Sequence, residues 1–166
     1  MTPQAHVAPL PEALTQVLQQ LRQELESLPS AQRMSDADAE TVYALAYREY
    51  GQARYEQALK YFQLLLVYRP THPVYLLGAA LCLRRARRYQ LAAAAFLALG
   101  FLEPTVPGHT LALAECQLLN HEHPQARDTL ALVIGYCDQH PGHGPVRARA
   151  QAMLDLMSPH HEPAVA

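Results

Sequence analysis

The chain has 166 residues, with 13 lysine and arginine residues against 15 aspartate and glutamate residues, so its formal net charge is -2. Because binding to nucleic-acid phosphates needs a concentrated basic surface, this balance argues against nucleic acid as a partner. The length suits one domain with a hydrophobic core of its own.

Cysteine usage and apolar runs indicate the compartment. Three cysteines, an odd number, fit a reducing compartment better than a disulfide scaffold. The N-terminal residues show no basic region followed by an apolar stretch, as a secretory signal would. The longest apolar run, 91–102, has 12 residues and is too short to span a bilayer. We therefore expect a soluble, cytoplasmic protein without stable membrane insertion.

The N-terminal part predicts one helix outside the rest of the fold. Residues 1–9 are polar and contain proline, and we expect them to be disordered. Residues 10–28 place leucines at helical spacing opposite a face of glutamine, glutamate and arginine, which predicts an amphipathic helix followed by a linker over 29–37. This apolar seam must be buried against the same chain or against a second copy. The candidate dimerisation residues are Leu14, Leu18, Leu21 and Leu25.

A 34-residue period organises the middle of the chain. Ala58, Ala92 and Ala126 are 34 residues apart, and phenylalanine and proline follow the first two at equal offsets. This period is the length of a tetratricopeptide helix–turn–helix unit. It predicts three repeats within 39–140, at 39–72, 73–106 and 107–140.

Each repeat is expected to hold two helices that approach closely where side chains are small. Those small residues are Ala46, Ala80 and Ala114 on the first helices and Ala58, Ala92 and Ala126 on the second helices. Pro70 and Pro104 are expected to end second helices, because proline cannot continue the hydrogen-bond ladder. The apolar run 91–102 is then the second helix of the middle repeat, and we expect it to be buried on nearly all sides.

The C-terminal part predicts a cap. Glycines at 142 and 144 interrupt the pattern, and residues 144–157 then carry an apolar stripe with a polar opposite face. Such a helix caps the last repeat with a polar outer surface. Residues 158–166 are expected to form a flexible tail. The predicted fold class is an all-α solenoid of three tetratricopeptide repeats between an N-terminal amphipathic helix and a C-terminal capping helix.

The chain resembles the tetratricopeptide family over about 39–140, and more closely the class II chaperones of bacterial type III secretion, which guard translocator proteins. The residues that carry this resemblance are Leu45-Ala46-Tyr47, Tyr50-Gly51, Ala53 to Ala58 and Tyr61-Phe62-Gln63 in the first repeat, Leu77-Gly78, Cys82 and Tyr89 to Ala92 in the second, and Ala114-Glu115-Cys116 in the third. The chain departs from the family at the turns between paired helices, where Ala53, Arg87 and His121 replace the usual glycine.

The resemblance implies a chaperone that binds hydrophobic translocators in the cytoplasm and keeps them soluble and competent for secretion. It implies a proline-containing extended segment of the translocator docked across the concave face, and homodimers that dissociate or rearrange with cargo. The alternatives are a chaperone of needle or filament subunits and a general tetratricopeptide scaffold between folded proteins. Catalysis has little support, since no nucleophile elbow, phosphate loop or carboxylate pair occurs, and no cofactor is expected.

The first helices of a tetratricopeptide stack line its concave face, with positions 2, 5, 9 and 12 of each repeat pointing into it. The predicted partner-binding residues are Tyr43, Tyr47, Tyr50, Leu77, Leu81, Arg84, Leu111, Glu115 and Leu118. The three tyrosines are expected to form an apolar face that packing within the repeat does not require and that suits peptide binding. The alternative is that the N-terminal helix folds back and covers them.

Some tetratricopeptide domains grip chaperone C-termini with a clamp of lysine, asparagine and arginine. The corresponding positions here hold Tyr43, Tyr47, Gly78, Gly108 and Ala112, so no carboxylate clamp is predicted. The ligand should instead be an internal extended segment with apolar anchors.

Three further groups have structural interpretations. The arginines at 84, 85, 87 and 88 are expected in a solvated turn, although Arg84 could touch the ligand. Cys82 and Cys116 are expected to be buried thiols, because helices about 8–10 Å apart are too distant for an easy disulfide. The histidines at 121, 123, 160 and 161 lack a ligand set at metal-binding spacing, so no metal site is predicted.

Overall fold

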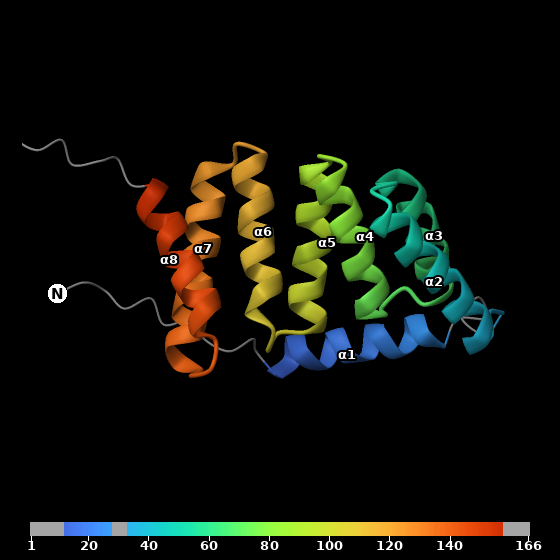
Figure 1. Cartoon of the computed structure of the whole chain (residues 1–166). Helices are drawn as coiled ribbons and strands as arrows, with labels where there is room; N and C mark the ends of the chain where they lie inside the picture. The colour runs from blue at the N-terminus through green and yellow to red at the C-terminus, as the bar shows by residue number, and fades with distance from the viewer. Residues whose placement is uncertain (1–11, 28–32, 158–166) are drawn as a thin grey trace, which may run out of the picture.

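The structure is a computed structural model that describes residues 12–27 and 33–157, which form eight α-helices and no strand (Figure 1). The helices are α1 Glu12–Glu26, α2 Asp36–Gly51, α3 Tyr55–Tyr68, α4 Pro73–Arg85, α5 Tyr89–Leu102, α6 Pro107–Leu119, α7 His123–Gln139 and α8 Gly144–Met157. The segments 1–9 and 158–166, for which disorder and a flexible tail are expected, lie outside the described residues, as does the linker up to residue 32.

The predicted all-α solenoid is confirmed. Each helix from α2 to α8 packs against the next, and α2–α3, α4–α5 and α6–α7 form three successive helix pairs. Figure 1 shows these helices standing in a row with α8 at the end. Because α2 also contacts α4 and α6 contacts α8, the first helices and α8 form one layer, and α3, α5 and α7 form the other.

Six alanines lie where the two layers meet. The side chains of Ala46, Ala80 and Ala114 on the first helices and Ala58, Ala92 and Ala126 on the second helices are all completely buried. Because these methyl groups have no exposed surface, a larger side chain at any of them would displace its neighbours or the backbone.

A phenylalanine and a glycine join the first repeat to the second. The ring of Phe62 on α3 is buried against Gly78 on α4, and a Cβ added at Gly78 would lie 2.2 Å from the Cε1 atom of that ring. Carbon atoms do not approach so closely, so this position accepts only glycine while the ring stays in place. Gly78, one of the residues that carry the family resemblance, therefore has a packing role.

Three turns adopt the left-handed conformation without glycine. Ala53, Arg87 and His121, the positions where the chain departs from the family, have φ angles of 58°, 59° and 62°. The next backbone N–H in each turn donates to a carbonyl five residues earlier: Arg54 to Glu49 at 3.0 Å, Arg88 to Leu83 at 2.9 Å and Glu122 to Gln117 at 2.8 Å. These bonds satisfy carbonyls at the helix end. Repeat packing therefore maintains the turn although a side chain there costs about 1–2 kcal/mol.

The expectation for the apolar run 91–102 is wrong in one respect. The run is α5, the second helix of the middle repeat, but Leu91, Leu97 and Phe101 are exposed. Helix α5 packs against α4 and α6, and no other helix of the described residues makes a substantial contact with it, so one side of the helix faces outward.

Helix α1 stands apart from the solenoid. It makes no substantial contact with another helix of the described residues, and Figure 1 shows it running crosswise to the row of α2–α8. On its apolar seam Val17 is 59% exposed and Leu21 is 50% exposed, while Leu25 is partly buried. The side chains of Leu14 and Leu18 lie outside the description. Val17 and Leu21 of the seam are therefore not buried within their own chain.

No helix in 12–27 or 33–157 is long and apolar enough to cross a bilayer.

Replacement of Gly78 by alanine should lower the free energy of unfolding by about 1–3 kcal/mol, because the new methyl group overlaps the Phe62 ring. The matched control is Gly108→Ala, also within a helix, where an added Cβ meets nothing within 4 Å. That change should be neutral or stabilise by up to about 1 kcal/mol. Urea unfolding followed by circular dichroism measures both, and equal stabilities of the two variants would contradict the packing role.

Candidate partner-binding site

The candidate site is the surface of the layer that contains α2, α4 and α6, which we call the first-helix face. Its predicted members come from all three helices: Tyr43, Tyr47 and Tyr50 from α2, Leu77, Leu81 and Arg84 from α4, and Leu111, Glu115 and Leu118 from α6. The structure places α4 beside Tyr43 of α2, since the ring centroids of Tyr43 and the core residue Tyr75 of α4 are 5.8 Å apart. It joins α4 to α6 through an ion pair between Arg84 and Glu115.

The three tyrosines do not have equal roles. Tyr47 is 66% exposed, whereas Tyr43 and Tyr50 are partly buried and pack against the core. The Tyr43 ring centroid lies 6.2 Å from that of Phe62, and the Tyr50 centroid lies 5.4 Å from that of Tyr55. The expectation that packing requires none of the three is therefore wrong for Tyr43 and Tyr50, because their rings fill the space between α2 and the neighbouring helices.

Tyr47 lies beside an anchored ring. Its ring centroid is 6.4 Å from that of Tyr43, which in turn contacts Phe62 and Tyr75 of the core. Aromatic pairs at this separation attract one another beyond their burial of area. Tyr47 is thus an exposed aromatic side chain on a rigid base, which reduces the conformational entropy that it would lose on contact with a ligand.

The apolar surface continues onto α4. Val74, the second residue of α4, is exposed, and Leu77 and Leu81 are partly buried. Since α1 makes no substantial contact with another described helix, the alternative in which the N-terminal helix covers the tyrosines does not describe this structure. Tyr47 and Val74 remain open to a partner.

Leu111 is not on this surface. Its side chain is buried in a cluster with Leu130 and Val133 of α7 and Ala150 of α8. Helical spacing within one repeat indicates only which face of α6 carries Leu111. It does not indicate that the capping helix α8 covers that part of α6. Leu118 is partly buried.

Charged side chains occupy the other end of the first-helix face. The Arg84 guanidinium lies 2.8 Å from one carboxylate oxygen of Glu115, and the Arg149 guanidinium of α8 lies 2.7 Å from the other. Arg84 also lies over the ring of Phe96, at 5.7 Å from its centroid. Arg149 was absent from the predicted site. The periodicity of α8 indicates only that it faces outward, and its proximity to α6 depends on how the cap packs.

The remaining arginines of the 84–88 cluster have separate partners. The side chain of Tyr50 interacts with Arg85 and raises the pKa of its guanidinium. Arg88 lies 3.7 Å from Glu56, and Arg87 is the left-handed turn residue. The cluster is thus divided among several contacts instead of facing one surface.

Glu49 is a buried acid outside the set of residues predicted from the sequence. It accepts hydrogen bonds from Arg48 and Arg54, each at 3.2 Å. Burial alone would raise its pKa, but the hydrogen bonds from Arg54 and Arg48 outweigh burial and the pKa lies below its ordinary value. Its backbone carbonyl also closes the first turn, so we assign Glu49 a structural role.

The three cysteines are free and buried. Burial raises the pKa of Cys82 and that of Cys116 to about 11, so both thiols are protonated near neutral pH and are poor nucleophiles. No group of three metal-ligating side chains occurs in the described part of the chain, which includes His121 and His123 but not His160 and His161.

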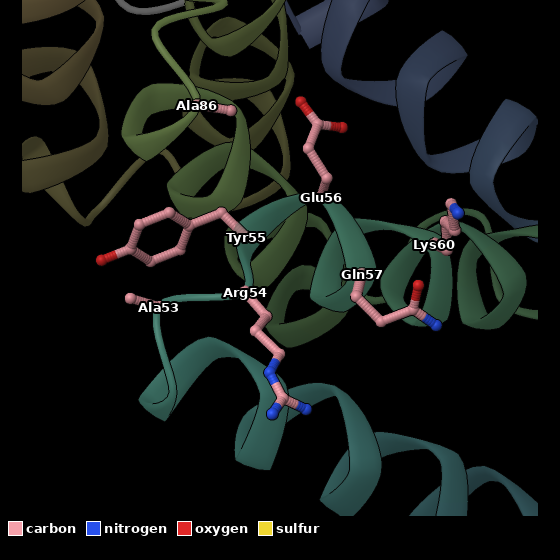
Figure 2. Close-up of a pocket in the computed structure, with 7 residues that line it drawn as sticks. All are labelled: Ala53, Arg54, Tyr55, Glu56, Gln57, Lys60 and Ala86. Atoms are coloured by element: carbon pink, nitrogen blue, oxygen red, sulfur yellow. The ribbon is translucent and has the colours of Figure 1, made fainter.

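An open hollow of about 600 Å³ lies elsewhere, at the turn between α2 and α3 (Figure 2). Its lining residues are Ala53, Arg54, Tyr55, Glu56, Gln57, Lys60 and Ala86. Figure 2 shows Arg54 turning back toward α2, where it pairs with Glu49. The hollow contains none of the predicted partner-binding residues, so it is separate from the first-helix face.

Comparison with known proteins confirms the family resemblance. In sequence and fold the chain is similar to translocator chaperones of bacterial type III secretion, although no family model matches it. Low calcium response locus protein H of Yersinia pseudotuberculosis is 29% identical over 127 residues, which cover 75% of this chain and 74% of that protein.

Two solved relatives are similar over most of their length. The chaperone SycD of Yersinia enterocolitica, in complex with a peptide of the translocator YopD, has a TM-score of 0.66 at 27% identity and covers 74% of this chain and 94% of its own. PcrH of Pseudomonas aeruginosa has a TM-score of 0.66 at 25% identity and covers 78% of this chain and 98% of its own.

Proposed function

We propose that this chain is a cytoplasmic chaperone without enzymatic activity that binds hydrophobic translocator proteins of a type III secretion system. The observation that carries the proposal is the exposure of Tyr47 on α2 and of Val74 on α4, a helix that contacts α2, in a chain similar to SycD and PcrH. SycD has been solved with a peptide of the translocator YopD, and PcrH with the chaperone-binding regions of PopD and PopB.

The physical basis is substitution of one apolar contact for another. A membrane-inserting segment in water associates with other apolar surfaces, including other copies of itself. On the first-helix face it would contact Tyr47, Val74, Leu77 and Leu81 instead. Full burial of an aromatic side chain removes about 150–250 Å² of surface from water. Burial of apolar surface contributes a favourable free energy of about 25 cal/mol per Å². The bound translocator would stay soluble and competent for secretion, with no nucleotide cycle.

The predicted binding residues divide into two groups in this proposal. Tyr47, Leu77, Leu81 and Leu118 would contact apolar anchors, with Arg84 and Glu115 at the charged end. Tyr43 and Tyr50 would support the surface from below, since their rings already pack on the core. The ligand would be an extended internal segment, and the proline content of that segment is what the family resemblance implies.

Co-expression tests the function directly. A membrane-inserting translocator from the same cell should move from the insoluble to the soluble fraction when this chain is present and should co-purify with it. An equal soluble fraction with and without the chain would contradict the proposal. Solubilisation of a needle or filament subunit, but not of a translocator, would favour the alternative chaperone class.

Replacement of Tyr47 by alanine should weaken binding of the co-purified segment by about 2 kcal/mol, as truncation of an aromatic hot spot does. Fluorescence anisotropy of the labelled segment measures the dissociation constant. The matched control is Leu132→Ala, an exposed apolar residue on α7 in the other layer, which should leave affinity unchanged. If Tyr47→Ala binds like the wild type while its circular dichroism spectrum is unaltered, the site lies elsewhere.

The proposal includes a homodimer in the absence of cargo. The seam of α1 exposes Val17 and Leu21 and makes no substantial contact with another described helix, so a second copy can cover it. SycD has been solved in an alternative dimer, which supports self-association in a relative. Leu14, Leu18, Leu21 and Leu25 would form the contact.

Changing both Val17 and Leu21 to glutamine should shift the free chain toward monomer, because two exposed apolar side chains of the seam become polar. Sedimentation equilibrium measures the mass. The control is Gln19→Ala with Gln20→Ala on the same helix, where exposed polar residues are changed and the dimer should persist. A persistent dimer in the Val17→Gln, Leu21→Gln variant would exclude the seam as its basis.

A further inference from the structure

The geometry points to a binding subsite for a carboxylate at the Arg84–Glu115–Arg149 end of the first-helix face. We infer that it receives an aspartate or glutamate side chain of the bound translocator segment, an inference that rests on the proposed function. The two guanidiniums approach the two oxygens of one carboxylate, at 2.8 Å and 2.7 Å.

The charges at this place are unbalanced. Two cations face one anion, so the three groups carry a formal charge of +1 in a chain whose total is -2. Among the ion pairs of the described residues, neither Arg84 nor Arg149 has a second acidic partner. Each guanidinium has five N–H donors in a planar fork that suits carboxylates. Donors therefore remain for a second carboxylate.

The subsite is already ordered before binding. Arg84 is held between Glu115 and the ring of Phe96, and Glu115 is only 15% exposed on its side chain. A guanidinium fixed in this way loses little conformational entropy when it binds. Arg149 is 65% exposed on its side chain, so a ligand can reach the pair from solvent.

The subsite is also close to the apolar anchors in sequence. Leu81 precedes Arg84 by three residues on α4, which is about 4.5 Å along the helix axis. An extended peptide advances about 3.3 Å per residue. A bound segment should therefore carry its acidic residue within about three positions of an apolar side chain.

A purely structural role for the triad makes a different prediction. If Arg149 only ties α8 to α6, its loss would change stability but would affect acidic and neutral ligands equally. A binding subsite is instead specific for ligand charge, and that difference can be measured with peptides.

The test uses the full chain and a displayed library of random peptides of about twelve residues, which extend to about 40 Å. Binders selected by the wild type should be enriched in aspartate or glutamate next to apolar residues. Selection with Arg149→Gln should lose this enrichment and keep the apolar residues. The matched control is Arg147→Gln on the same helix, whose partner is Asp138 of α7, and it should select like the wild type.

A selected peptide and its Glu→Gln counterpart then give the size of the effect. The wild type should bind the acidic peptide about tenfold more tightly, the scale of one charge-assisted hydrogen-bonded pair. Arg149→Gln should reduce this ratio to about twofold or less, with an unchanged dissociation constant for the glutamine peptide. The ratio should also fall as salt concentration rises.

The outcomes separate the inference from the proposed function. Apolar peptides without acidic enrichment, or an acidic preference that Arg149→Gln retains, would overturn the carboxylate subsite and leave the chaperone proposal standing. If no selected peptide loses affinity with Tyr47→Ala and no translocator becomes soluble in co-expression, the chaperone proposal fails, and the subsite fails with it.

Discussion

The packing of helix against helix at six completely buried alanines is the constraint on which the rest of the structure depends. Because these positions carry only methyl groups, the first and second helices of each repeat can pack closely against each other. The same contact recurs every 34 residues, so each repeat is placed on the next in a similar way. Two layers result, and the surface of one of them is the first-helix face.

The repeated packing is strong enough to impose other features. At the three turns it maintains left-handed backbone at Ala53, Arg87 and His121, although none of these residues is glycine. Between repeats it requires glycine where the Phe62 ring would otherwise meet a side chain. The same core anchors Tyr43, which supports the exposed Tyr47. A stable scaffold thus presents a small number of apolar side chains to a partner, and the ion pairs of Arg84 add a charged end to that surface.

The sequence by itself determined the fold class, because the 34-residue period and the helical spacing of apolar residues are local properties of the chain. It also indicated where two second helices end, since α3 stops at Tyr68 before Pro70 and α5 stops at Leu102 before Pro104. The family resemblance followed from residues within single repeats. For the candidate site, helical spacing predicted that Tyr47, Leu77 and Leu81 lie on the partner-binding face of the first helices. In the structure Tyr47 is exposed, and the two leucines are partly buried.

Only the tertiary structure decided how those side chains divide between core and surface. Helical spacing treats Tyr43, Tyr47 and Tyr50 alike, yet contacts from α3 and α4 bury two of them in part. The capping helix buries Leu111 and brings Arg149 to Glu115, which no periodicity within α6 could indicate. The physical reason is that spacing along one helix reports its own faces, whereas burial and ion pairing depend on neighbours that are distant in sequence.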